Sequence, residues 1–260
     1  MKFLFSFAAF CLCCSMFAAS ADWMPRPRKN SSKITVKGDV TTIRGPELQI
    51  WSKKAYSAKK DCTLRISGEF LQSVPNRRFY IGLMCLDKNG KQIQGRESVP
   101  ISGSDTVLLA PVKKGDRSIL VKDASKWRYM GGTYAAFHGK ADYSDLPNRD
   151  TSHAPIVHIE KENNGWRITF RHGMRKEYKA GTPVRQQGGG SAYVVVVANK
   201  KFPAGWNKLE TKYKLAWHPA GQLYKKNLLF PGTAAFRVVF RVEECDTTLA
   251  MKNVKITVGK

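Results

Sequence analysis

Apolar and polar residues alternate along most of the chain beyond residue 46, and this period of two constrains the fold more than any other feature. The stretch CTLRISGEF, residues 62–70, places its Cys, Leu, Ile and Phe side chains on one face of an extended strand. The stretches 207–217 and 234–244 repeat this pattern, and no apolar spacing of 3.6 residues is sustained. Many short strands with one polar face each predict an all-β sandwich or barrel.

The first 21 residues have a different character. Lys2 precedes a short apolar run, and Ala19 and Ala21 stand where a signal peptidase cleaves. We therefore expect residues 1–21 to be a signal peptide and the mature protein to be secreted, either periplasmic, extracellular or on the cell surface. Residues 22–45 are basic and contain Pro-Arg-Pro-Arg, which predicts a linker. No later stretch is apolar enough to predict a membrane span.

The middle of the chain has shorter strands and denser Gly, Asp and Asn turns than its flanks. Longer alternating strands resume only after the Gly-rich stretch 188–191. This change predicts a nested architecture. Residues 46–110 and 190–260 form one discontinuous jelly-roll sandwich, and residues 111–187 form a small β-barrel-like module inserted into it.

Two resemblances accompany this division. The stretches FYIGLMCLDKNGKQI and FPAGWNKLETKYKL resemble the galactose-binding-like jelly rolls of family 4 and family 9 carbohydrate-binding modules. The stretches KKGDRSILVKDASKW, IVHIEKENNGWRITF and KAGTPVR are similar to a small β-module of adhesin-like extracellular proteins. The first resemblance implies sugar binding, and the second implies a β-fold with no known reaction.

The loop 130–153 holds the most concentrated set of candidate ligand-binding residues. Sugars stack on aromatic rings, and carboxylates and amides bind their hydroxyl groups. The alternative is that the aromatic side chains enter the core and the acids cap turns. Two tryptophans outside regular strand positions are further candidates for stacking. The predicted ligand-binding residues are Trp127, Tyr134, Phe137, Asp142, Tyr143, Asp145, Asn148 and Trp206.

The charge balance indicates the kind of partner. The chain has 44 Lys and Arg residues against 20 Asp and Glu residues, a net charge of +24. Such a field attracts polyanions. In a secreted protein this favours an anionic polysaccharide, and no nucleic-acid-binding signature accompanies the charge. The basic residues expected on outward strand faces are Arg167, Arg171, Lys208, Lys212, Lys214, Arg237 and Arg241.

Cysteines and metals are expected to contribute little. Beyond the predicted signal peptide only Cys62, Cys85 and Cys245 remain, so at most one disulfide can form. Three pairings are open, and Cys62–Cys245 is favoured because both residues stand at strand ends. No cofactor is expected. A weaker alternative is Ca²⁺ bound by oxygen ligands in the candidate loop, namely Asp142, Asp145 and Asp150.

The sequence therefore predicts a non-catalytic carbohydrate-binding protein rather than an enzyme. One alternative is a structural or adhesive cell-surface protein. A less favoured one is a jelly-roll polysaccharide lyase, because EYKAGTPVRQ is similar to the YxKAGxYxQ strand of alginate lyases. The other lyase strands, Arg-Ser-Glu-Leu-Arg and Gln-(Ile/Val)-His, are missing. The base would then have to come from His153, His158 or His172.

Overall fold

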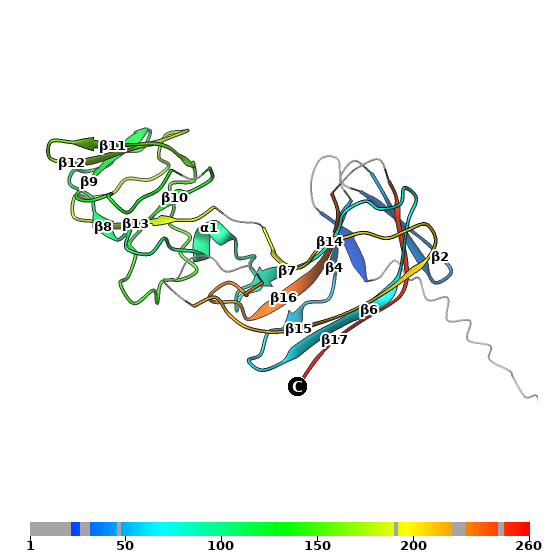
Figure 1. Ribbon diagram of the computed structural model, residues 1–260. Helices are drawn as coiled ribbons and strands as arrows, with labels where there is room; N and C mark the ends of the chain where they lie inside the picture. Colours follow the sequence, from blue (N-terminus) through cyan, green and yellow to red (C-terminus); the bar gives the residue numbers. More distant parts are fainter. Residues whose placement is uncertain are drawn as a thin grey trace, which may run out of the picture.

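The computed structural model describes residues 22–26, 32–45, 48–129, 131–189, 192–219, 227–243 and 247–260 (Figure 1). These residues form strands β1 to β17 and one short helix, α1 (Gly95–Ser98). The prediction of an all-β sandwich fold is confirmed. The predicted signal peptide lies outside the described residues, and no helix within them is long and apolar enough to cross a membrane.

Two antiparallel sheets make the sandwich. The six-stranded sheet has the order β1 (Trp23–Pro25), β4 (Gln49–Ser52), β16 (Ala235–Val242), β7 (Phe79–Leu86) and β14 (Val194–Lys200), with β5 (Tyr56–Ser57) paired to β16. The five-stranded sheet has the order β15 (Asn207–Lys214), β6 (Thr63–Gln72), β17 (Leu249–Gly259), β3 (Val40–Arg44) and β2 (Lys33–Lys37).

The core between these sheets follows from the alternation in the sequence. Leu64, Ile66 and Phe70 project inward from β6, and all three are buried. The Phe70 ring lies 5.2 Å from Phe79 and 5.4 Å from Phe240, measured between ring centroids. Each buried aromatic or aliphatic side chain of this kind contributes about 1.5–3 kcal/mol to stability. The polar faces of the same strands are left on the outside of the sandwich.

The middle of the chain forms two smaller antiparallel sheets with a separate core. Figure 1 shows this group of strands at one side of the view, away from β2 and β17. Its first strand pairs with its last, since Thr106 lies opposite Val184. The sheets are β10 (Tyr134–Phe137), β13 (Pro183–Gln187) and β8 (Thr106–Val107), and β11 (Ile156–Glu162), β12 (Gly165–Phe170) and β9 (Ser118–Val121).

We call the part from β8 to β13 the small module. Its strands begin a few residues before the predicted start at Pro111, because β8 joins the sheet of β13. The strands of both larger sheets come from before β8 and after β13. The division into a discontinuous sandwich and an inserted module stays a prediction. It requires the strands of the two smaller sheets to be consecutive in the chain, and β8 to β13 are.

The prediction that residues 22–45 form a linker is wrong, because β1, β2 and β3 lie within this stretch. Trp23 stacks on Phe240 of the core with ring centroids 4.6 Å apart. Ile43 on β3 is also buried in the core. The stretch 33–44 forms a hairpin that turns at Gly38, whose φ is +61°. The basic, proline-containing composition hid this alternation.

An ion-pair cluster links the small module to the chain that leads into it. The Arg149 Nη2 atom lies 2.8 Å from the Asp87 carboxylate, and its Nε atom lies 3.5 Å from Glu97 on α1. The Asn148 backbone N–H also donates to the Glu97 carbonyl at 2.7 Å. These contacts hold the loop of the small module against α1.

The cysteines do not follow the favoured pairing. Cys62 and Cys85 are both buried free thiols, so Cys62 is not bonded to Cys245, which itself lies outside the described residues. Burial raises the pKa of the Cys85 thiol to about 11, so it remains neutral at physiological pH. Both cysteine side chains pack among the apolar residues of the core.

Candidate functional site

The candidate loop of the small module is organised around a buried arginine. Arg185 on β13 is fully buried, and its Nη2 donates to the Asp145 carboxylate at 2.5 Å. Its Nη1 donates to the Lys140 carbonyl at 3.1 Å, and the guanidinium lies 5.1 Å from the Tyr143 ring centroid. Asn148 donates to the same Asp145 carboxylate at 2.8 Å. The predicted ligand-binding residues Tyr143, Asp145 and Asn148 are thus brought together, but around a side chain of the protein itself.

Two of the predicted aromatic platforms are core residues, which corrects the prediction. Trp127 is buried, and its indole N–H donates to the Ser104 carbonyl at 2.7 Å. Phe137 is fully buried and stacks on Tyr178 with ring centroids 3.8 Å apart. Neither ring presents a face to solvent, because both belong to the core of the small module.

The other two residues predicted in the loop lie apart. Tyr134 is half-buried on β10, with the Arg96 guanidinium 5.6 Å from its ring centroid. Asp142 is exposed and accepts a hydrogen bond from the Ser144 backbone N–H at 3.0 Å. This bond closes a local turn and lowers the pKa of Asp142. The loop therefore supplies no shared cluster of rings and carboxylates facing solvent.

Asp150 collects three donors from the small module. It accepts hydrogen bonds from Lys176 at 2.6 Å and from Tyr178 at 2.9 Å, and it contacts the His138 ring at 2.8 Å. Burial raises the pKa of Asp150, but these donors outweigh it, so its pKa lies below the usual range. Burial and the hydrogen bond to Asp150 raise the pKa of Tyr178, which disfavours its phenolate form.

These contacts also account for the three aspartates weighed as Ca²⁺ ligands. Asp142 caps a turn, Asp145 pairs with Arg185, and Asp150 binds Lys176. Within the part of the chain that the structure describes, no group of three or more His, Cys, Asp or Glu side chains could hold a metal ion.

A different surface gathers charge: the outward face of strands β15, β6 and β17. The register aligns Lys208 with Glu69 on β6, and Glu69 with Lys252 on β17. Two residues further along, Glu210 and Lys255 flank Ser67, and beyond them Lys212 lies opposite Arg65. Residues directly opposite in antiparallel strands share one face of the sheet. We call this surface the basic face, and its cations are Arg65, Lys208, Lys212, Lys214, Lys252 and Lys255.

The prediction identified part of this face. Lys208, Lys212 and Lys214 lie on the polar side of β15, as the alternation indicates. Arg237 and Arg241, predicted on similar stripes, belong to the other sheet and bind within the protein. Arg237 donates to the Ser52 carbonyl at 3.0 Å, and Arg241 donates to the Tyr193 hydroxyl at 3.3 Å.

Trp206 stands at the start of β15, beside the basic face. It is 39% exposed, as predicted, and the Lys252 ammonium lies 4.6 Å from its ring centroid. The turn before it is held by Asn207, whose side-chain amide donates to the Pro203 and Gly205 carbonyls at 3.0 and 2.7 Å. Gly205 permits this turn with a φ of +89°. The turn fixes the Trp206 backbone directly before β15, the strand that pairs with β6.

The basic face also carries hydrogen-bonding groups and a cavity. The Asn253 amide donates to the Glu69 carboxylate at 2.9 Å, and the Lys252 ammonium lies 3.8 Å from the same carboxylate. A cavity of about 410 Å³ is lined by Glu69 and Asn253 together with Lys208 and Lys255. A carboxylate, an amide, cations and an aromatic ring are therefore available to one ligand on this surface.

Comparisons with known proteins give no family. No family model matches the chain, and no curated protein matches it. The chain is similar to the crystal structure of a Parabacteroides distasonis ATCC 8503 protein that is provisionally described as a glycosyl hydrolase. The two share 14% identity with a TM-score of 0.27, over 90% of this chain and 98% of the other. The resemblance to family 4 and family 9 carbohydrate-binding modules stays a prediction.

Proposed function

We propose that this protein, in secreted form, binds an anionic extracellular polysaccharide along the basic face without catalysing its cleavage. The observation that carries the proposal is the set of six cations that share the outward face of β15, β6 and β17, with the exposed Trp206 beside it.

The dimensions of this surface suit a polymer rather than a single sugar. Adjacent strands lie about 4.8 Å apart, and residues rise about 3.4 Å along a strand. The cations from Lys208 to Lys214 therefore span roughly 20 Å along β15. Carboxylate or sulfate groups along an acidic chain can contact several of these ammonium groups at once. Binding releases the counterions of both partners, which makes the affinity depend on salt.

Other groups supply contacts that salt screens less. The Trp206 ring can stack on the C–H face of a sugar, and this requires the Lys252 ammonium to move from its position over the ring. The Glu69 carboxylate can accept hydrogen bonds from sugar hydroxyl groups, and the Asn253 amide can donate hydrogen bonds to them. A charged surface with one exposed ring supports selection of a saccharide over a simple polyanion.

The small module supports a different role. Its candidate loop is turned inward, with Asp145 bound to Arg185 and Phe137 stacked on Tyr178. These contacts favour the alternative of a structural or adhesive role for the module. The lyase alternative has less support, because Tyr178 of the EYKAGTPVRQ stretch is buried in the small module, hydrogen-bonded to Asp150 and stacked on Phe137.

Equilibrium binding to three immobilised polysaccharides tests the proposal: a sulfated one, a uronate and a neutral glucan. Each is measured at about 0.05 M and about 0.3 M salt. We expect the anionic polymers to bind, with part of the affinity surviving at the higher salt and depending on Trp206. Equal binding to the neutral glucan, or no binding to either anionic polymer, would contradict the proposal. Reducing-end and unsaturated-product assays on the same polymers test for cleavage, which we expect to be absent.

A further inference from the structure

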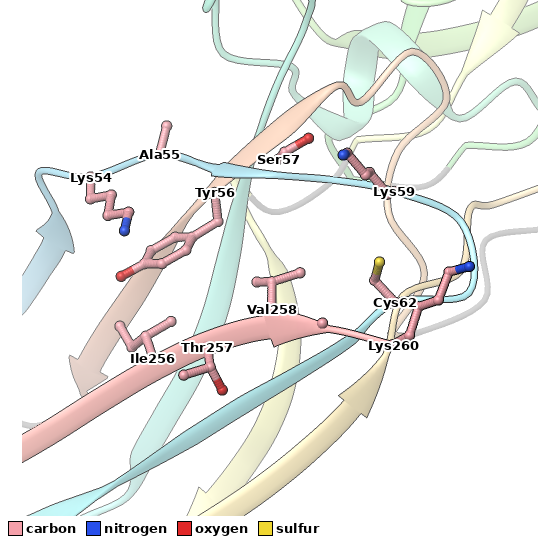
Figure 2. Close-up of a pocket in the computed structure, with 11 residues that line it drawn as sticks. Lys54, Ala55, Tyr56, Ser57, Lys59, Cys62, Ile256, Thr257, Val258 and Lys260 are labelled. Carbon is pink, nitrogen blue, oxygen red and sulfur yellow. The ribbon is translucent and has the colours of Figure 1, made fainter.

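A second cavity lies at one edge of the sandwich, where the β5 segment of the six-stranded sheet faces the end of β17. Its volume is about 640 Å³, within the range of small-molecule sites. Figure 2 shows the Tyr56 ring and the Val258 side chain between the two segments. Lys54 lies at one end, and Lys59, Cys62 and Lys260 lie at the other. None of these residues belongs to the basic face.

The middle of this cavity has an apolar wall, and the core of the sandwich supports it. Tyr56 is half-buried, and its ring stacks on Phe236 of the core with centroids 5.9 Å apart. The Lys54 ammonium lies 5.3 Å from the same ring centroid. Ile256 and Val258, both half-buried, continue the apolar wall from β17. A flat ring placed here would contact one aromatic face and two aliphatic side chains, and this requires the Lys54 ammonium to move from its position over Tyr56.

The charged side chains that line this wall have one sign, and Asp22, which acts on Tyr56 from nearby, is not among them. The charged residues that line the cavity, within the described part of the chain, are Lys54, Lys59 and Lys260. Lys59 and Lys260 both lie toward the Cys62 end of the apolar wall, with their ammonium groups apart (Figure 2). For an anionic group on a ring over Tyr56 to meet these two ammonium groups, both lysine side chains must turn toward it.

We propose that this cavity binds a carboxylate carried on a six-membered ring. A hexuronic acid and a benzoate-type aromatic acid share this chemistry, since each has a ring face for Tyr56 and an anionic group for Lys59 and Lys260. A neutral sugar lacks the charge, and an inorganic anion lacks the ring face. The proposal is independent of the polysaccharide proposal, because none of the cations of the basic face lines this cavity.

Cys62 provides a local readout. It lines the cavity, is 8% exposed, and stands near Lys59 and Lys260. The neutral reagent iodoacetamide is applied to the folded protein, and alkylation of the Cys62 peptide is followed by mass spectrometry. The probes are glucuronate, 4-hydroxybenzoate, glucose and inorganic sulfate at equal ionic strength. Isothermal titration of the same probes gives a reading that does not depend on thiol reactivity.

We expect at least one ring carboxylate to bind and to slow Cys62 alkylation severalfold, while glucose and sulfate do neither. Binding of glucuronate alone identifies a saccharide ligand, and binding of 4-hydroxybenzoate alone identifies an aromatic acid. If neither ring carboxylate binds, or if sulfate or glucose binds as well as they do, the proposal is overturned.

Variants place the binding in the cavity. Lys59→Ala should weaken ring-carboxylate binding severalfold, whereas Lys60→Ala, an exposed neighbour outside the cavity lining, should leave it unchanged. Tyr56→Phe should retain binding because it keeps the ring, and Tyr56→Ala should lose it. Since Tyr56→Ala also removes a core contact, the exposed Lys59 carries the decisive comparison. Equal affinities of the Lys59→Ala and Lys60→Ala variants would overturn the proposal.

Discussion

Lys212 and Arg65 lie directly opposite each other on the adjacent antiparallel strands β15 and β6, with both side chains on the outward face of the sheet. Like charges placed directly opposite in a sheet destabilise the fold. A sequence selected for stability alone would place an acid at one of these positions. The pair is a repulsive contact that an anionic group bound between the two side chains would relieve.

The first prediction concerns this pair. Lys212→Glu should raise the free energy of unfolding by about 0.5 kcal/mol, because it replaces a repulsive pair with an attractive one at a screened surface. The same change should weaken binding to an anionic polysaccharide severalfold at low salt. Urea denaturation and equilibrium binding measure the two effects. Lys114→Glu, in an exposed turn of the small module, is the control with the same change of charge. If it weakens binding equally, net charge rather than the basic face is responsible.

The second prediction concerns the ring beside the basic face. Trp206→Ala should weaken the salt-resistant part of saccharide binding by about 1 kcal/mol, roughly fivefold, because a stacking surface is lost. Trp206→Phe should retain part of the affinity. Tyr129→Ala removes an aromatic ring that is 67% exposed in the small module and should have no effect. Affinities measured at about 0.3 M salt decide between these outcomes.

The third prediction concerns the buried ion pair of the small module. Asp145→Asn should destabilise the module by about 3–5 kcal/mol, because it leaves the fully buried Arg185 guanidinium without its counter-charge. Asp142→Asn is the matched control, since Asp142 is exposed and closes only a local turn. Chemical denaturation should show a large shift for the first variant and a small one for the second. Similar shifts for both would contradict a supporting role for the Asp145–Arg185 pair.

The fourth prediction concerns acid stability. The pKa of Asp150 is lowered in the folded protein, so the unfolded state binds more protons in the range between the two pKa values. The stabilisation by Asp150 is present above the ordinary aspartate pKa of about 3.9 and is lost as the pH falls through the folded pKa. The urea concentration at the unfolding midpoint should therefore decrease as the pH is lowered below about 4. In Asp150→Asn this decline should be shallower, and an unchanged slope would show that Asp150 does not contribute to it.

Alternation beyond residue 46 was sufficient to predict an all-β sandwich, because a half-buried strand requires a period of two, but it did not reveal β1, β2 and β3. It was not sufficient for the site. Lys252 and Lys255 are three residues apart, so strict alternation places them on opposite faces. A register shift between them aligns Lys252 with Glu69 and Lys255 with Ser67, which brings both lysines to the basic face. Asn253 lies within this irregularity and has a φ of +53°.

The candidate loop illustrates the opposite failure. The aromatic and acidic residues of the loop have the composition of a sugar site. Arg185, which is distant from the loop in the sequence, instead binds Asp145 from the interior of the small module. No local pattern reveals that a single buried cation will organise such a loop. The exposure of Trp206 could be predicted because it follows the loop Phe-Pro-Ala-Gly and precedes a strand.

The pairing of β8 with β13 has a consequence for how such a chain can change over generations. Because Thr106 and Val184 lie opposite each other, the chain enters and leaves the small module at adjacent points, about 5 Å apart. The backbone bonds from Ile101 to Gln186 and from Gly188 to Val99 continue this pairing toward the sandwich. A duplication, exchange or deletion of the module would need only a short rejoining of two neighbouring segments. Replacement of the module as a cassette would require this geometry, and the β15, β6 and β17 surface lies outside the segment that would be exchanged.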